Sequence, residues 1–286
     1  MALSNVHNLP RVFQRFEQRH QHSTEGAEFS VSGLIDSPQI AKLRRENEVE
    51  EDISDRAFAI LGTAVHKILE DGAGEGEIAE ERFHAEIAGA SISGQVDLRT
   101  PTSSGYLLSD YKTCRTLTLQ INPGGKVEWQ NQLNCYAALA RENGVEVSGI
   151  EVIAILRDWS ASGLKKSPDY PQSAITRVPI ELWEAPRALQ YMEERVRLHR
   201  QGGGDCSPAE RWARPPVFAV YTRTKSGGQR KRATKLFDSR TDAEAFAMNE
   251  LGASVVERDA VYARCEGNFC GVREFCTQYR EIENAG

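Results

Sequence analysis

The stretch SISGQVDLRTPTSSGYLLSDYKTC, residues 91–114, decides the fold. It contains two runs rich in alternating apolar and polar residues, separated by Pro, Ser and Gly, and this pattern predicts two strands joined by a turn. Asp97 lies in the first run, and Asp110 and Lys112 lie in the second. Because Asp110 and Lys112 are two residues apart on one strand, both side chains are expected to project from the same face.

The segments on either side of this stretch alternate between helical and strand patterns. Residues 55–71 carry apolar residues at helical spacing and predict a partly buried helix, and residues 83–88 predict a strand. Residues 127–143 return to the helical period, with Gly144 at the position that follows a helix, and residues 147–159 are the most apolar strand. This order predicts an α/β core with a mixed sheet flanked by helices.

We divide the chain into three parts. Residues 1–54 are expected to form N-terminal helical and strand elements that pack on the core, and residues 55–204 the core itself. Residues 205–286 are expected to form an α+β extension clamped by cysteines. Between Cys206 and Cys265 the pattern predicts a hairpin, a helix and a strand.

Composition narrows the class of protein. With 286 residues, 40% of them hydrophobic, the chain is able to bury a substantial core. It has no long apolar run and no signal-peptide core, so we expect a soluble, intracellular, cytoplasmic protein without membrane association. The net charge of −6 argues against coating nucleic acid by bulk electrostatics, but it allows a local basic groove. In a reducing cytosol, the six cysteines indicate metal binding or catalysis rather than disulfides.

The predicted strands bring together groups that suit phosphodiester hydrolysis. Carboxylates such as Asp97 and Asp110 hold divalent cations, which stabilise developing charge and activate water. Lys112 would steer and polarise the attacking water. His66 adds an imidazole ligand from the preceding helix, and Glu70, four residues later, is a further candidate ligand on the same helical face.

Four segments in order, LGTAVHKILE, GQVDL, LSDYKT and WQNQLNCYA, resemble the RecB-type exonuclease branch of the PD-(D/E)XK nuclease superfamily. That branch has a histidine on a helix, an aspartate after a glycine, a D/E-x-K strand and Q-x-x-x-Y on the next helix. The matching residues here are His66, Asp97, Asp110 with Lys112, and Gln132 with Tyr136. The resemblance covers roughly residues 55–160, about a third of the chain, and the four elements together are far more specific than any one alone.

The resemblance implies a restriction-endonuclease-like fold and a metal-dependent DNA nuclease. It favours an exonuclease that acts on DNA ends or single strands in recombination, repair or phage and mobile-element processing, leaving 5′-phosphate and 3′-hydroxyl ends. Gln132 and Tyr136 would hold Lys112 and the DNA strand. The implied ligands of Mg²⁺ or Mn²⁺ are His66, Asp97, Asp110 and the backbone carbonyl of Tyr111.

Three alternatives stay open at this point. The first is a catalytically inactive DNA-binding or adaptor protein that keeps the nuclease fold. The second is an RNA-directed or structure-specific endonuclease that shares the same chemistry. The third is a zinc-held regulatory module in which the D-x-K strand is a solvated ion pair.

A cysteine cluster lies near the C-terminus and resembles the iron–sulfur staple of RecB-like nucleases, including the CRISPR-associated ones. In those relatives one distant cysteine and three C-terminal cysteines hold a [4Fe–4S] cluster. The lone cysteine usually precedes the core, whereas this chain has none before Cys114. We expect Cys206 to be the fourth ligand, because Cys114 and Cys135 fall inside core elements as structural thiols. The alternatives are Zn²⁺ and metal-free thiols. The three C-terminal cysteines, in a C-x₄-C-x₅-C pattern, are Cys265, Cys270 and Cys276.

The stretch RTKSGGQRKRATK, residues 223–235, is strongly basic and contains no acidic residue. It is either a solvated hairpin tip or a surface that contacts DNA phosphates. The residues assigned to DNA contact are Arg223, Lys225, Arg230, Lys231 and Arg232.

Overall fold

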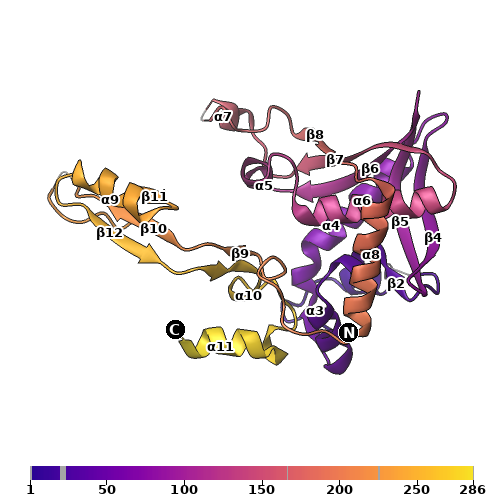
Figure 1. The fold of residues 1–286 in the computed structure, drawn as a ribbon, viewed down its shortest axis with the longest axis horizontal. Helices are drawn as coiled ribbons and strands as arrows, with labels where there is room; N and C mark the ends of the chain where they lie inside the picture. Colours follow the sequence, from indigo (N-terminus) through magenta and orange to yellow (C-terminus); the bar gives the residue numbers. More distant parts are fainter. Residues whose placement is uncertain (1, 20–23, 166, 225, 286) are drawn as a thin grey trace. The chain divides into compact units, whose positions relative to one another are not determined.

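The computed structural model describes residues 2–19, 24–165, 167–224 and 226–285. Two compact units make up the chain, residues 1–203 (unit 1) and residues 204–286 (unit 2). The elements of both are labelled in Figure 1. The N-terminal elements, residues 1–54, which were expected to pack on the core, belong to unit 1 together with the predicted core.

Unit 1 is built around a six-stranded mixed sheet in the order β2-β5-β6-β7-β8, with β4 paired to β5. The pairs β2–β5 and β6–β7 are parallel, and the other pairs are antiparallel. The strands are β2 Phe29–Ser30, β4 Ile78–Ile87, β5 Ala90–Thr102, β6 Gly105–Cys114, β7 Val147–Leu156 and β8 Ile175–Ile180. Helices flank this sheet, so the predicted α/β class is confirmed.

Helix α6 is the most deeply buried helix of unit 1, and it contacts the sheet, α2 and α8. The helices are α1 Val12–Arg19, α2 Val31–Ile35, α3 Pro38–Glu46, α4 Ala57–Glu70, α5 Thr116–Ile121, α6 Val127–Glu142, α7 Ala161–Leu164 and α8 Ala185–Arg200. Three short elements complete the unit: β1 Ala2–Ser4, β3 Glu50–Asp52 and the 3₁₀ helix η1 Ile53–Arg56.

Gly94 of β5 lets α6 and α2 approach the sheet closely. A Cβ at this position would lie 2.8 Å from Tyr136 and from Val31, and 2.9 Å from Leu139. These separations are too short for real carbon atoms, so any side chain here would push the helices away from the strand. The glycine of the GQVDL segment therefore has a packing role.

The predicted helix, three strands, helix and strand are confirmed as α4, β4, β5, β6, α6 and β7. The prediction that α4 is partly buried is confirmed: Val65, His66 and Leu69 are half-buried, while no residue of the helix is fully buried and Phe58 and Ile68 are 61% and 69% exposed. The residues that α4 presents to the pocket described below include Ala59, Gly62 and Thr63, so its larger apolar side chains are not the ones that make this contact.

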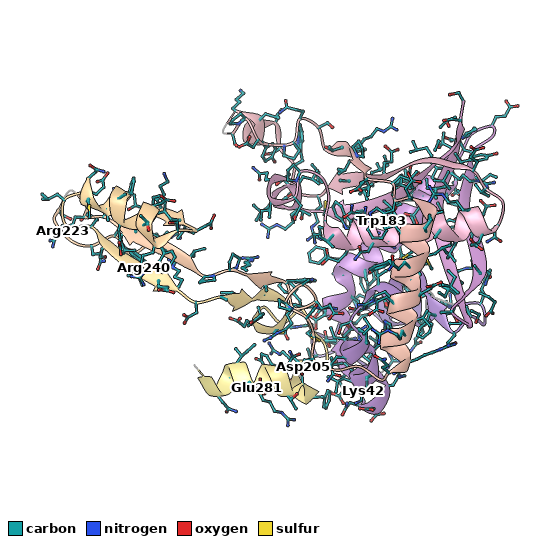
Figure 2. The ribbon with its side chains drawn as sticks, viewed as in Figure 1. Lys42, Trp183, Asp205, Arg223, Arg240 and Glu281 are labelled. Carbon is teal, nitrogen blue, oxygen red and sulfur yellow. The ribbon has the colours of Figure 1, made fainter. Side chains whose placement is uncertain are left out.

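Unit 2 contains a three-stranded antiparallel sheet, β11-β10-β12, and a short pair, β9 with β13. The hairpin, helix and strand predicted between Cys206 and Cys265 are confirmed as β10, β11, α9 and β12. Arg223, labelled in Figure 2, follows β10 in the hairpin loop. The elements are β9 Ala213–Arg214, β10 Val217–Tyr221, β11 Lys235–Phe237, α9 Arg240–Met248, β12 Ser254–Arg258, β13 Val261–Tyr262, α10 Ala263–Glu266, η2 Arg273–Phe275 and α11 Thr277–Ala285.

Within the described ranges, no helix has both the length and the apolar character needed to cross a bilayer.

Candidate active site

The regular strand pairing of unit 1 is interrupted around Asp97. The ladder between β4 and β5 omits one position, where Glu80 lies opposite Asp97. The ladder between β5 and β6 ends just before Asp97 and Asp110. In its place, the backbone N–H of Tyr111 donates a hydrogen bond to Asp97 Oδ2 at 2.6 Å. The two interruptions leave these carboxylates free to point into one space.

His66 reaches this space from α4. Its Nδ1 lies 3.3 Å from Asp97 Oδ1 and 3.7 Å from Glu80 Oε1. Burial lowers the pKa of His66. The hydrogen bonds to Asp97 and Glu80 and the charges of Asp97 and Asp110 together outweigh burial and raise the pKa to about 10. Without a metal ion, the imidazolium is therefore the cation that these carboxylates surround.

Asp110 is buried, with 2% of its surface exposed, and Lys112 Nζ lies 2.6 Å from its Oδ2. Burial raises the pKa of Asp110, and although the charge of Lys112 opposes this rise, the pKa reaches about 6. A buried carboxylate oxygen is costly unless a donor or a cation meets it. Within the described part of the chain, the Lys112 ammonium is the cation that meets the buried Oδ2.

Gln132 and Tyr136 lie one turn apart on α6 and face the same space. Gln132 Nε2 donates a hydrogen bond to the Tyr136 hydroxyl oxygen at 2.8 Å. Burial, followed by the charges of Asp110 and Asp97, raises the pKa of the Tyr136 hydroxyl well above its usual range. Tyr136 is thus a neutral hydroxyl beside the carboxylates.

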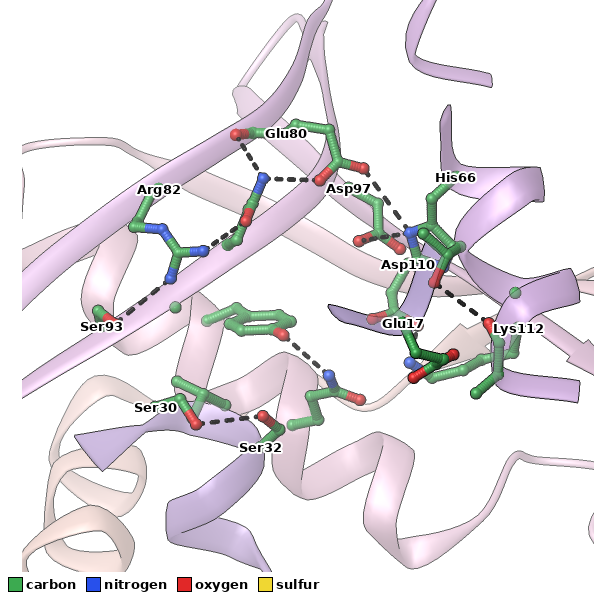
Figure 3. Close-up of a pocket in the computed structure, with 18 of the residues that line it drawn as sticks. Glu17, Ser30, Ser32, His66, Glu80, Arg82, Ser93, Asp97, Asp110 and Lys112 are labelled. Carbon is green, nitrogen blue, oxygen red and sulfur yellow. Dashed lines mark hydrogen bonds and ion pairs between the residues drawn. The ribbon is translucent and has the colours of Figure 1, made fainter. Parts of the chain in front are cut away.

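These groups line one pocket of about 430 Å³ (Figure 3). Figure 3 shows the carboxylates of Glu80 and Asp97 directed toward His66. Of the expected site residues, the pocket brings together His66, Asp97, Asp110, Lys112, Gln132 and Tyr136. Other elements contribute Glu17 from α1, Ser30, Ser32, Arg56, and Arg82 and Glu80 from β4. Tyr111 lies next to Asp110 on β6, where its register partner is Ile153 of β7.

Glu70 does not join this group, although it is four residues after His66. Its carboxylate pairs with Lys67 Nζ at 2.7 Å, and it is not among the residues that line the pocket. The carboxylate near His66 is instead Glu80, which the sequence analysis missed. Its signal was the two-residue turn at Ala88 and Gly89, where both φ angles are positive, as hairpins of this kind require. That turn sets the register and places Glu80 opposite Asp97.

The donor set fits a hard divalent cation. Among the described residues, His66, Glu80 and Asp97 offer ligand atoms that all lie within 4.8 Å of one another. Asp110 adds the buried oxygen described above. Carboxylate oxygens with one imidazole nitrogen suit Mg²⁺ or Mn²⁺ better than a thiol-binding metal.

The four cysteines expected to bind a cluster are all buried in unit 2, each 9% exposed or less. Burial raises the pKa of the Cys270 thiol, and the charges of Cys265 and Cys276 raise it further. The group of ligand atoms within 4.8 Å of one another that occurs among the described residues, His66, Glu80 and Asp97, includes no cysteine. The Gln278 side chain holds the backbone of Cys206 through two hydrogen bonds, 2.7 Å from Cys206 N–H and 3.1 Å to Cys206 O. Cys206 is therefore tied to the start of α11, two residues after Cys276.

The insert between these cysteines closes at its base. Ala213 pairs with Tyr262 between β9 and β13, and Arg264 N–H donates to Arg211 O at 3.1 Å. This pairing keeps the segment after Cys206 beside the segment that carries Cys265.

The basic hairpin loop is exposed and ordered by its own contacts. Thr222 and Thr234 pair through their hydroxyls at 2.7 Å, and Arg223 forms a bridge with Gln229. Lys225 lies outside the described residues. Within residues 223–235, the exposed basic side chains for which no acidic partner occurs among the described residues are Arg223, Arg230, Lys231, Arg232 and Lys235.

No family model matches the chain, and no curated protein matches it. One similar solved structure is described as "Crystal structure of SSO0001"; the two share 19% identity over 70% of this chain and 86% of that chain, with a TM-score of 0.47.

Proposed function

We propose that the chain is a Mg²⁺- or Mn²⁺-dependent deoxyribonuclease of the RecB-type PD-(D/E)XK kind, acting as an exonuclease on DNA ends or single strands. The observation that carries the proposal is the convergence of His66, Asp97, Asp110 and Lys112 in one pocket, from an α4 helix and two adjacent strands. These four residues come from three separate segments of the motif. If the D-x-K pair were a chance ion pair, there would be no reason for the segments that carry His66 and Asp97 to lie beside it.

Each residue has a defined task in the proposed reaction. His66, Asp97 and Asp110 would hold the divalent cation, with the Tyr111 carbonyl as a further ligand. When bound, that cation supplies charge stabilisation at the phosphate and activation of water. Lys112, held 2.6 Å from Asp110, donates hydrogen bonds to the attacking water and orients it toward phosphorus. Hydrolysis breaks the bond between phosphorus and the 3′ oxygen and leaves a 5′-phosphate and a 3′-hydroxyl.

Gln132 and Tyr136 limit how Lys112 moves and where the DNA strand lies. Their mutual hydrogen bond fixes both side chains on the α6 wall of the pocket. A neutral tyrosine hydroxyl and an amide are suitable donors to a phosphate oxygen, and they add no charge that would repel DNA.

The four cysteines of unit 2 are proposed to hold a [4Fe–4S] cluster with a structural role. The burial of all four and the Gln278 contacts that hold Cys206 support this assignment. Zn²⁺ is the competing occupant, since the same thiolates bind it. Iron and zinc analysis of anaerobically purified protein, with its visible spectrum, separates the two, because a zinc protein is colourless.

The test of the proposed function is cleavage of end-labelled linear single-stranded and double-stranded DNA, beside a covalently closed circle, with Mn²⁺ or Mg²⁺. The variants are Asp110→Asn and Lys112→Ala, and Glu70→Gln on α4 is the matched control outside the pocket. We expect linear DNA to be degraded and circles spared. Loss of general acid–base or electrostatic groups of this kind costs about 10²–10⁴-fold in rate, whereas the control is expected to keep the wild-type rate.

The remaining outcomes separate the alternatives. Cutting of circles would make the protein an endonuclease, and cutting of RNA alone would change the substrate. If no substrate is cut while wild type and both variants bind DNA equally, the catalytic proposal is wrong and a DNA-binding or adaptor role replaces it.

A further inference from the structure

We infer that Glu80 is an additional ligand of the divalent cation, and that Gln95 and Arg82 are positioning residues that hold its carboxylate. This inference rests on the proposed function. Glu80 lies on β4, outside the four segments that carry the resemblance to RecB-type nucleases.

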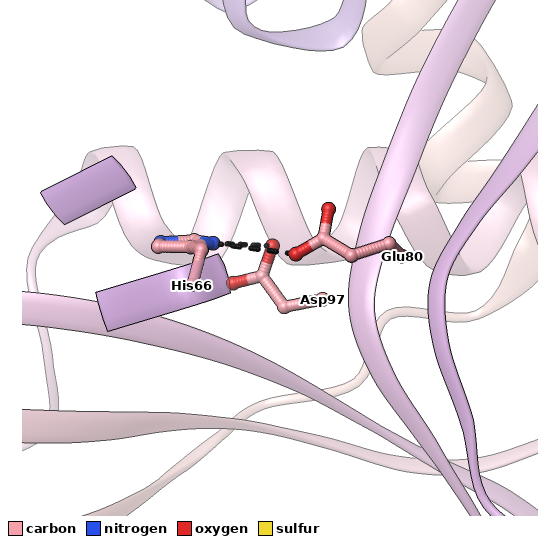
Figure 4. A group of neighbouring side chains, drawn as sticks. All are labelled: His66, Glu80 and Asp97. Atoms are coloured by element: carbon pink, nitrogen blue, oxygen red, sulfur yellow. Dashed lines mark ion pairs between the residues drawn. The ribbon is translucent and has the colours of Figure 1, made fainter. Parts of the chain in front are cut away.

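The first observation is where the Glu80 carboxylate points. Figure 4 shows His66, Asp97 and Glu80 directed toward one another. Glu80 Oε1 lies 3.7 Å from His66 Nδ1. One ligand atom from each of the three residues lies within 4.8 Å of the other two. Ligand atoms that each lie about 2.0–2.5 Å from a shared cation are separated by distances of this size.

The second observation is the balance of charge in the pocket. The charge of Asp110 is paired with Lys112, whose Nζ lies 2.6 Å from Asp110 Oδ2. A metal-bound histidine is neutral. Among the described residues, the ion pairs of Glu80 and Asp97 are with His66 alone, whereas the other charged groups of the pocket pair with one another or with Glu25. With His66 neutral, Glu80 and Asp97 therefore leave two negative charges, which one divalent cation neutralises.

The third observation is the backbone at Glu80. Its φ is +53°, a left-handed conformation that is uncommon for a residue with a side chain. It also sits opposite Asp97 on the neighbouring strand, where two like charges repel each other. Side-chain contacts around Glu80 hold it in this arrangement.

Gln95 and Arg82 supply those contacts. Gln95 Nε2 donates to Glu80 Oε2 at 2.7 Å and to the Glu80 carbonyl at 3.2 Å. Gln95 Oε1 accepts a hydrogen bond from Arg82, whose guanidinium has only donors, so the Gln95 amide must turn its NH₂ group toward Glu80. One oxygen of Glu80 is thereby fixed, and the other, Oε1, stays directed at His66 and Asp97. Arg82 is itself held 3.3 Å from Glu25 Oε1.

The experiment is calorimetric titration of Mn²⁺ into the metal-free full-length protein, with the Mn²⁺-induced rise in melting temperature as a second readout. The variants are Glu80→Gln, which keeps the size and the contact with Gln95, and Arg82→Gln. The control is Glu86→Gln, an exposed glutamate on the same strand. We expect Kd for Mn²⁺ to rise about 10–100-fold in Glu80→Gln and roughly tenfold in Arg82→Gln, with partial rescue by Arg82→Lys. The control is expected to match wild type.

Two further variants, Asp97→Asn and Asp110→Asn, keep this inference separate from the proposed function. If they weaken Mn²⁺ binding while Glu80→Gln binds as wild type does, the role of Glu80 is overturned and the nuclease site stands. If none of the carboxylate variants changes Kd, the cation site itself is absent and the proposed function fails. If Glu80→Gln weakens binding but Arg82→Gln does not, Arg82 has no positioning role.

Discussion

The acidic pocket of unit 1 and the four buried cysteines of unit 2 are both proposed to hold a metal, but their surroundings differ. The pocket groups come from α4, β4, β5 and β6, and the three strands contribute to the large core that also contains residues of α6 and α8. Among the described residues of unit 2, the buried apolar residues other than the four cysteines are Ala219, Val220, Ala243 and Val272. In unit 1 the packed core therefore positions the candidate ligands. In unit 2, which has few buried apolar residues, a bound metal centre would instead stabilise the fold.

The largest expected effect is loss of structure in unit 2 when the proposed metal centre is removed. A structural metal bound by thiolates contributes on the order of 10 kcal/mol to the stability of a small domain. We therefore expect Cys270→Ala to abolish protection of unit 2 amides in hydrogen exchange, while amides of α6 and β7 stay protected. Cys114→Ala, at the end of β6, is the control that should leave unit 2 unchanged. Wild-type protection in Cys270→Ala would show that unit 2 folds without the centre.

The next effect tests the other half of the comparison, that the core of unit 1 positions the pocket. Gly94→Ala places a methyl group 2.8 Å from Tyr136 and Val31, so we expect about 1–3 kcal/mol of destabilisation from overpacking. The measurement is the free energy of unfolding of unit 1. Gly124→Ala is the matched control, because a Cβ there meets nothing within 4 Å. Equal stability of the two variants would contradict the close packing of α6 on β5.

The main helices and strands of unit 1 could be predicted from the sequence because they are long and have a regular apolar period. The alternation in residues 91–114 predicted β5 and β6, and the helical spacing of Trp129, Leu133 and Tyr136 predicted α6. The exposure of Phe58 on α4 was not predictable, since periodicity identifies an apolar face but not what covers it.

The site was predictable only as far as its motif extends. His66, Asp97, Asp110 and Lys112 lie in segments whose spacing is recognisable, whereas Glu80 owes its place to strand register and to a left-handed backbone. Register depends on the turn that joins β4 to β5, and a single sequence identifies such turns less securely than it identifies long periodic elements.

A smaller effect, on the salt dependence of DNA binding, is expected at the basic hairpin of unit 2. Its charge is opposite to that of the acidic pocket of unit 1. If Arg230, Lys231 and Arg232 contact phosphates, replacing all three by glutamine reduces the slope of log K against log salt for DNA binding by about 2–3. The cleavage rate at saturating DNA should not change. The control is Arg44→Gln with Arg45→Gln, two exposed positions of α3. An unchanged slope in the hairpin variant would make the loop a solvated tip, and an equal loss in the control would show binding by general charge.

The smallest expected effect is a pH dependence confined to unit 1. Burial lowers the pKa of His199, whose Nε2 lies 3.0 Å from Leu34 O, whereas unit 2 contains no histidine. As pH falls below the ordinary histidine pKa of about 6.5, the unfolded chain binds a proton that the folded chain does not, so unfolding becomes more favourable. We expect wild type to lose stability relative to His199→Gln between pH 7.5 and pH 5, with both measured by unfolding of unit 1 in urea. Because the variant shares every other titrating group, a constant difference between the two proteins would mean that the His199 ring is protonated without cost in the fold.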